Sequence, residues 1–256
     1  MARNDQRIED EPHLRGVAPQ GGDLSGEPAL SATGVRQPTD VDHTVWDEPT
    51  LVSQQDGAEA PEGQLTYERW LERGIRQTTW FESLSLTLLV ALAAGPWGVL
   101  GAFITSSRGG EIGWTTLLTV GVLAPVTEEI TKVAALLWAV EKRPYWFKSM
   151  WQVIFCAAMG GLAFGVIENL IYTNVYVPNG SDAFLRWRWG VCTGLHLNCS
   201  TLAGIGLVRI WGNAIRERRR PELALGMPFF AMAMVGHGLY NVGVMFAEVA
   251  GVLTFD

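Results

Sequence analysis

Five long apolar stretches constrain what this chain can fold into. A bilayer core takes about 20 apolar residues in helical form, and stretches of that length recur from residue 84 onward in a chain of 256 residues. They lie near residues 84–105, 113–139, 150–177, 189–210 and 226–253. The pattern predicts an all-α protein, a polytopic transmembrane helix bundle of about five spans, over residues 81–256.

Residues 1–80 differ from the rest in composition. They carry 15 Asp and Glu against 7 Arg, with many Gly, Pro, Gln and Ser and no long apolar run. Such a composition cannot bury a core, so we expect a disordered acidic tail. The remaining residues hold 11 acidic and 12 basic side chains, which leaves no basic face for nucleic acid. The opening residues lack the apolar segment of a cleavable signal peptide, so the tail is expected in the cytoplasm.

The basic residues that flank the stretches predict an orientation. With the tail inside, eleven Lys and Arg fall on inner flanks and three on outer loops, which is a positive-inside bias. We therefore expect the N-terminus in the cytoplasm and the C-terminus outside. Small residues at helical spacing, Ala157, Gly161 and Gly165 in the third stretch and Gly190 and Gly194 in the fourth, favour central positions for these two helices.

The second stretch carries three charged residues, Glu128, Glu129 and Lys132. Each charge costs about 2.5–3.5 kcal/mol at the centre of a membrane helix on insertion scales, so the three cannot face lipid. Their spacing of three and four residues lets Lys132 pair with either carboxylate. A structural ion pair is the simplest alternative to a functional site, but one glutamate would suffice for it.

The three later stretches carry one polar group or pair each. Glu168 lies in the third, His196 in the fourth, and His237 with Asn241 in the fifth, four residues apart and so on one helix face. Each alone could be a satisfied interhelical hydrogen bond. However, Glu128, Glu168, His196 and His237 all fall about 12–15 residues from the inner ends, roughly 18–22 Å. A shared level on four helices predicts one site in the bundle interior.

These residues, taken in order, resemble the PrsW family of intramembrane proteases and, more distantly, the CAAX-processing and abortive-infection membrane proteases. The resemblance covers roughly residues 84–250. It is carried by EEITK at Glu128 to Lys132, FGVIEN at Phe164 to Asn169, the helix around His196, and HGLYN at His237 to Asn241. Glu168 stands where the wider superfamily has a histidine, which argues against processing of prenylated proteins.

The resemblance implies an integral protein of the bacterial plasma membrane that cleaves membrane-anchored proteins, among membrane lipids. The eponymous member is associated with an anti-sigma factor, so a regulatory protein of that kind is the expected substrate. Peptide hydrolysis needs a water, a base and a stabiliser for the oxyanion. We assign Glu128 as base, Glu129 as its support and Lys132 as the group that holds both. Asn241 would orient the carbonyl or stabilise the oxyanion.

The sequence leaves two questions open, the use of a metal and the class of function. His196, His237 and Glu168 could bind zinc, since two imidazoles and a carboxylate are typical ligands of a catalytic site, but Glu128 could also act on water without a metal. In addition, a transporter or proton relay would use the same kind of Glu and His layer. A non-catalytic scaffold that recruits partners through its tail is a third alternative.

Overall fold

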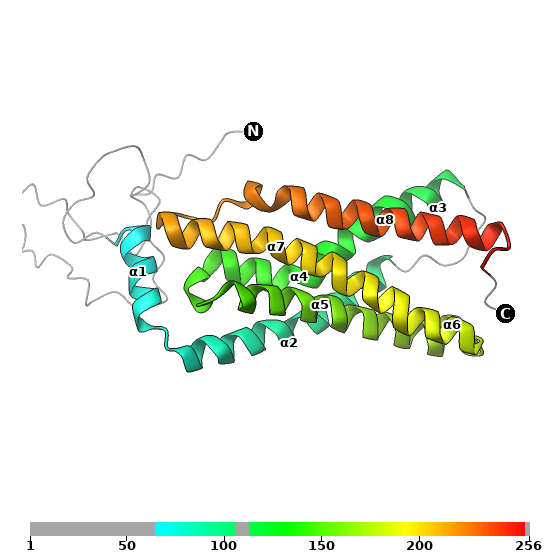
Figure 1. Ribbon diagram of the computed structural model, residues 1–256, viewed down its shortest axis with the longest axis horizontal. Coiled ribbons are helices and arrows are strands. Elements are labelled where there is room, and N and C mark those ends of the chain that lie inside the picture. The colour runs from blue at the N-terminus through cyan, green and yellow to red at the C-terminus, as the bar shows by residue number, and fades with distance from the viewer. Residues whose placement is uncertain (1–64, 106–112, 254–256) are drawn as a thin grey trace, which may run out of the picture. The chain divides into compact units, whose positions relative to one another are not determined.

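The computed structural model describes residues 65–105 and 113–253, and every regular element in these ranges is helical (Figure 1). This confirms the all-α prediction. The tail prediction for residues 1–64 lies outside the described residues. Five helices of 19 residues or more form the bundle. They are α2 (Trp80–Thr105), α4 (Ala124–Lys142), α5 (Met150–Ile171), α7 (Thr193–Glu217) and α8 (Met227–Val249).

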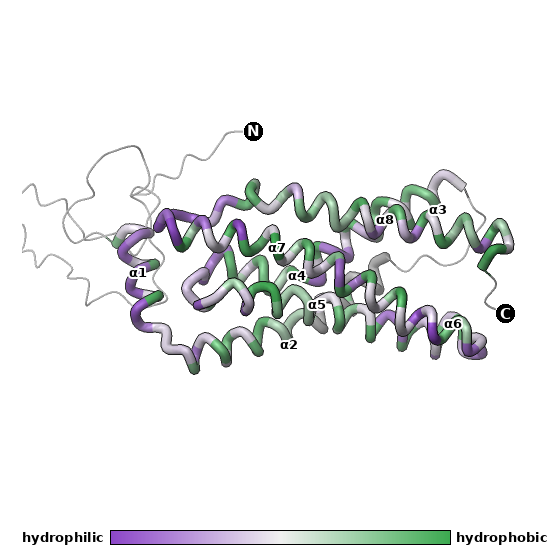
Figure 2. Tube along the Cα trace, viewed as in Figure 1, coloured by the Kyte–Doolittle hydropathy of each residue, from purple (hydrophilic) through white to green (hydrophobic). Residues whose placement is uncertain are grey.

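Three continuous helical stretches are long and apolar enough to cross a membrane: Met150–Tyr176, Asp182–Glu217 and Leu223–Val249. They coincide with the third, fourth and fifth predicted spans. The first predicted span overlaps a shorter apolar helix, Trp80–Ala94, and the second contains the charged residues of α4. Large apolar side chains such as Leu88, Leu92 and Leu239 are exposed on the bundle, as expected for surfaces that face lipid. Figure 2 shows that hydrophobic residues recur along the length of the bundle helices. The count of five spans stays a prediction.

Local signals shape the first turns of two bundle helices. Pro125 lies in the first turn of α4, which continues directly from the π-helical residues Thr119–Leu123, so its missing N–H leaves a carbonyl of that segment without a helical donor. At α5, Ser149 and Gln152 form a capping box that satisfies backbone N–H groups at the helix start. The Gln152 amide also donates to Ser83 Oγ and Thr87 Oγ1 of α2, each at 2.8 Å. The first turn of α5 is thereby hydrogen-bonded to α2.

Small residues bring α5 and α7 into close contact, as predicted for two central helices. A Cβ atom added at Gly204 would lie 2.6 Å from the Cβ atom of Ala157, and one added at Gly161 would overlap the carbonyl oxygen of His196. The backbone that carries His196 therefore lies directly against α5. Gly190 and Gly194 do not take part, because added Cβ atoms there would meet open space.

Three short π-helical segments adjoin the bundle helices that carry the polar residues. They are η5 (Thr119–Leu123) before α4, η7 (Tyr172–Tyr176) after α5 and η8 (Arg188–Cys192) before α7. Two short α-helices precede η5 and η8, namely α3 (Trp114–Leu118) and α6 (Asp182–Trp187). π-Turns often occur at functional sites, and all three lie on the same side of the polar layer.

A helix also forms within residues 1–80, which the sequence analysis assigned to the disordered tail. This helix, α1 (Tyr67–Gln77), begins at the N-cap Thr66 and buries Tyr67, Trp70, Leu71 and Gly74. The spacing of these four residues is that of one helix face. They pack on Tyr145 in the short 3-10 segment η6 (Pro144–Trp146). Residues 67–77 are therefore helical and packed on the bundle, although composition had assigned them to the tail. A second 3-10 segment, η9 (Leu223–Gly226), precedes α8.

Candidate active site

The polar residues of the second to fifth predicted spans meet in the interior of the bundle. Helix α4 supplies Glu128, Glu129 and Lys132, while α7 and α8 supply His196 and His237. Lys132 and Glu129 have no exposed surface, and both histidines are 2% exposed. In an apolar environment such groups are tolerated only when they bind one another or a ligand.

Lys132 lies at the centre of this cluster. Its Nζ atom is 2.7 Å from Glu129 Oε1, 2.8 Å from His196 Nδ1 and 3.5 Å from Glu128 Oε2. The ring of Phe164 covers it, with the centroid 4.3 Å from Nζ. An ammonium group can only donate hydrogen bonds. It therefore donates to Nδ1 of His196, and the proton of this ring is on Nε2.

The Nε2 proton of His196 meets Glu168. His196 Nε2 lies 2.9 Å from Glu168 Oε2, and the same carboxylate oxygen accepts a hydrogen bond of 2.7 Å from Arg188 Nη2. Glu168 is thus shared between the histidine of α7 and the arginine of η8. The ion pair explains how a carboxylate on α5 can stay charged at this depth.

Arg188 joins this cluster, although the sequence analysis counted it among the outer-loop charges. Its side chain is 6% exposed. The Arg188 guanidinium donates from Nε to Asn169 Oδ1 at 3.0 Å and lies 3.9 Å from the centroid of the Tyr172 ring. The Asn169 amide donates back to the backbone oxygen of Arg188 at 3.1 Å. The signal in the sequence was an arginine at the very start of an apolar stretch, eight residues before His196.

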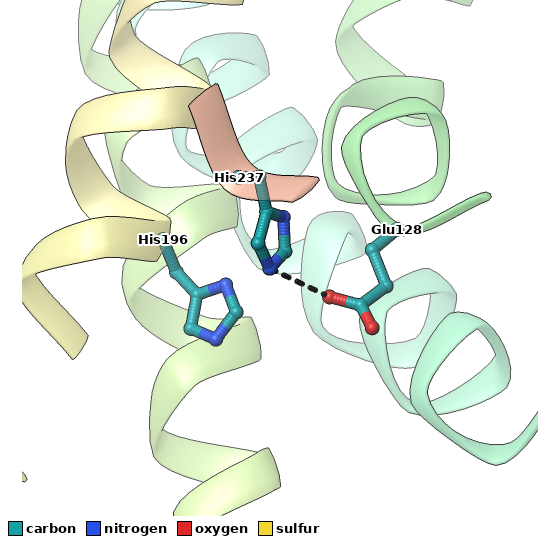
Figure 3. Close-up of side chains that lie close together, drawn as sticks. All are labelled: Glu128, His196 and His237. Atoms are coloured by element: carbon teal, nitrogen blue, oxygen red, sulfur yellow. Dashed lines mark ion pairs between the residues drawn. The ribbon is translucent and has the colours of Figure 1, made fainter. Parts of the chain in front are cut away.

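His237 faces both glutamates of α4. Its Nδ1 atom donates to Glu129 Oε1 at 2.8 Å, which leaves the lone pair of the ring on Nε2. That nitrogen lies 3.7 Å from Glu128 Oε2 (Figure 3). Figure 3 shows the rings of His196 and His237 and the carboxylate of Glu128 converging from three helices. The two rings pack edge to face, with centroids 5.0 Å apart.

Asn241 lies on α8 one turn beyond His237, but its amide does not join these side chains. Asn241 Nδ2 donates to the backbone oxygen of Val120, in η5, at 3.3 Å. The bond is long, so it holds the side chain weakly. Through this bond, Asn241 connects α8 to the π-turn that precedes α4.

Three side chains form a group that could hold a metal ion. Glu128, His196 and His237 each offer one ligand atom, and these atoms all lie within 4.8 Å of one another. Two imidazoles and a carboxylate fit zinc by donor type. The hydrogen bond from His237 Nδ1 to Glu129 is the usual support for a histidine ligand. His196 would have to release Lys132 or Glu168 to ligate, since both of its nitrogens are engaged.

Buried acidic and histidine side chains between apolar helices are the features of a membrane-embedded protein with a polar site in its interior. A family model described as the PrsW family intramembrane metalloprotease matches residues 78–255. The chain therefore belongs to the PrsW family of intramembrane metalloproteases. No curated protein and no solved structure matches the chain.

Proposed function

We propose that this protein hydrolyses peptide bonds of membrane-anchored proteins, with Glu128 as the base that activates water. Membership of the family supports proteolysis inside the membrane. The observation that carries the residue assignment is the pair formed by Glu128 and His237. Their facing atoms, Oε2 and Nε2, are 3.7 Å apart in the buried cluster, so one water could contact both.

The remaining side chains have distinct roles in this proposal. Glu128 takes the proton of the attacking water and passes it to the leaving amine. Lys132, 3.5 Å from the Glu128 carboxylate, balances the negative charge that develops nearby. Glu129 holds Lys132 and His237 in place through the same oxygen, Oε1. Asn241 would donate to the oxyanion after release from its long bond to Val120.

A zinc ion fits the same cluster, with Glu128, His196 and His237 as the residues that would hold it. When bound, it would supply a Lewis acid that polarises the scissile carbonyl and the attacking water. Glu128 would then be a ligand of the metal, and the proton of the attacking water would need another acceptor. Glu129 Oε2 is available, because it is buried and has no hydrogen-bond partner among the described residues. The donor set therefore differs from the one proposed on sequence, in which Glu168 was the third ligand.

The substrate class follows from the position of the site. A peptide must reach side chains that lie between apolar helices, so a single-span protein whose helix partly unwinds is the fitting substrate. An anti-sigma-like regulatory protein belongs to this class. The chain of hydrogen bonds from Glu168 through His196, Lys132 and Glu129 to His237 would also suit a proton relay, which the following experiment separates from proteolysis.

The test is cleavage of candidate single-span proteins by the purified chain in nanodiscs, with products identified by mass spectrometry. Glu128→Gln should lower the cleavage rate at least a hundredfold, because the amide keeps the shape of the side chain but cannot take a proton. Glu248→Gln is the matched control on α8, where Glu248 is exposed, and should stay within twofold of wild type. Full activity of Glu128→Gln would move the base to Glu129 or Glu168. Proton flux without any cleavage would favour the relay.

A further inference from the structure

A polar cavity outside the catalytic cluster lies where α1 packs on the bundle; Figure 1 shows α1 at one end of the long helices. The cavity measures about 110 Å³, room for several waters or one phosphate-sized group. It lies between α1, the C-terminal end of α4 and the segment after α7. Its lining residues are Tyr67, Trp70, Glu141, Lys142, Arg143, Arg220 and Pro221.

The charge of the lining favours an anion. Among the described residues of the lining, three side chains are cationic and one is anionic, which gives this part of the wall a net charge of two positive units. The Lys142 ammonium lies 3.5 Å from the Glu141 carboxylate. The two guanidinium groups, of Arg143 and Arg220, present planar donor sets that suit phosphate oxygens.

Aromatic rings of α1 hold both guanidinium groups in position. The Cζ atom of Arg143 lies 5.7 Å from the centroid of the Trp70 ring, and that of Arg220 lies 5.5 Å from the Tyr67 ring. Trp70 is itself fixed by an edge-to-face contact with Tyr145, at 5.2 Å between centroids. Helix α1 precedes the segment that matches the family model, residues 78–255. This wall of the cavity therefore lies outside the matched segment.

The hydroxyl group of Tyr67 is an independent sign of a ligand. Tyr67 is only 6% exposed, and its hydroxyl has no hydrogen-bond partner among the described residues. Burial raises the pKa of this phenol well above its usual value, although Arg220 acts in the opposite direction. The group thus stays protonated and able to donate. A buried donor without an acceptor is costly, and an anion in the cavity would satisfy it.

The level of the cavity in the bundle indicates which anion. Trp138, one turn before Lys142 on α4, is 52% exposed and contacts Trp146 at 5.7 Å between ring centroids. Exposed tryptophans at helix ends mark the boundary between lipid tails and headgroups. Basic pockets at this level are typical sites for anionic lipid headgroups. We propose that the cavity binds the phosphate headgroup of an anionic phospholipid, with Arg143, Arg220, Lys142 and Tyr67 as its donors.

The experiment measures lipid binding by the full chain purified in detergent. Short-chain phosphatidylglycerol, phosphatidylcholine of the same chain length and inorganic phosphate are titrated separately, and Kd is taken from native mass spectrometry and thermal shift. Wild type should bind phosphatidylglycerol at least tenfold more tightly than phosphatidylcholine. Arg220→Gln should weaken phosphatidylglycerol binding about tenfold or more, and Lys142→Gln severalfold.

Two further variants distinguish binding at a specific site from nonspecific attraction to positively charged residues. Tyr67→Phe removes only the hydroxyl and should weaken binding about three- to tenfold, as expected for one hydrogen bond to a charged group. Arg219→Gln removes an exposed cation beside Arg220 that does not line the cavity, and should change Kd less than twofold. Equal loss in Arg219→Gln and Arg220→Gln would overturn the proposal. So would inorganic phosphate that binds as tightly as phosphatidylglycerol, since the site would then take a soluble anion.

Discussion

Lys132 Nζ lies 2.8 Å from His196 Nδ1, which connects α4 and α7 across 64 residues of sequence. Because an ammonium only donates, this bond fixes the tautomer of His196 and turns its Nε2 proton toward Glu168. Lys132 also pairs with Glu129, which accepts from His237. One lysine therefore orients both histidines, one directly and one through a carboxylate.

Lys132→Ala should lower both stability and activity. The change leaves Glu129 buried without its cationic partner, and breaking a buried pair in this way costs about 3–5 kcal/mol. We expect a lower yield of folded protein and a melting temperature reduced by several degrees, measured in detergent. Lys148→Ala is the control, since Lys148 lies outside the cluster. A variant of Lys132 with wild-type stability would show that the carboxylates find other partners.

Arg188→Gln should lower kcat at least tenfold with a smaller effect on KM. Arg188 contacts no group that we assign to the reaction itself, and it acts by holding Glu168 against His196. Arg188→Lys should recover part of the rate, because a lysine keeps the charge but cannot bind Glu168 and Asn169 at once. Arg186→Gln, two residues away and exposed, is the control. Equal rates for the Gln and Lys variants would contradict a role in positioning.

Metal content separates the two proposed donor sets. If Glu128, His196 and His237 ligate zinc, purified protein should carry close to one zinc per chain by elemental analysis, and Glu128→Gln, His196→Ala and His237→Ala should each reduce it. Glu168→Gln should leave the metal content near that of wild type. The opposite result for the two glutamates would restore Glu168 as the ligand proposed on sequence. Fully active metal-free protein would leave Glu128 alone as the activator of water.

The topology prediction rests on the positive-inside bias of eleven basic residues against three. A reporter fused after Asp256 should be outside the cell, and one inserted in the segment that follows α7, residues 218–222, should be in the cytoplasm. Protease accessibility or a pair of compartment-specific reporters measures this. A cytoplasmic C-terminus would mean that the number of spans is even.

Sequence patterns predicted the helical class, three of the membrane helices and the residues that meet in the interior. The patterns were informative because a charged side chain in an apolar membrane helix is costly. Charged and polar side chains at a common depth on several helices are therefore expected to meet in the bundle interior. The patterns did not predict that Arg188 binds Glu168. Counting along a regular α-helix from His196 gives the wrong direction for the Arg188 side chain at the first residue of η8, since a π-turn adds a residue.

The short helix α1 was missed for a different reason. Its mean composition is polar, and only four residues on one face are buried. Its packing partner, Tyr145, lies about 75 residues later in the sequence. Composition averaged over a window cannot show a partner of that kind, whereas the spacing of Tyr67, Trp70, Leu71 and Gly74 was visible in the sequence.

The π-turns determine the direction in which the side chains beyond them point. Helices α4, α5 and α7 each adjoin one π-turn, namely η5, η7 and η8, and α5 and α7 pack tightly against each other through Gly161 and Gly204. Removing one residue from η8 would restore an α-helix and rotate everything beyond it by about 100°, so Arg188 would turn away from Glu168 while His196 kept its place. The π-turn η8 therefore sets the direction of the Arg188 side chain relative to the part of α7 that carries His196.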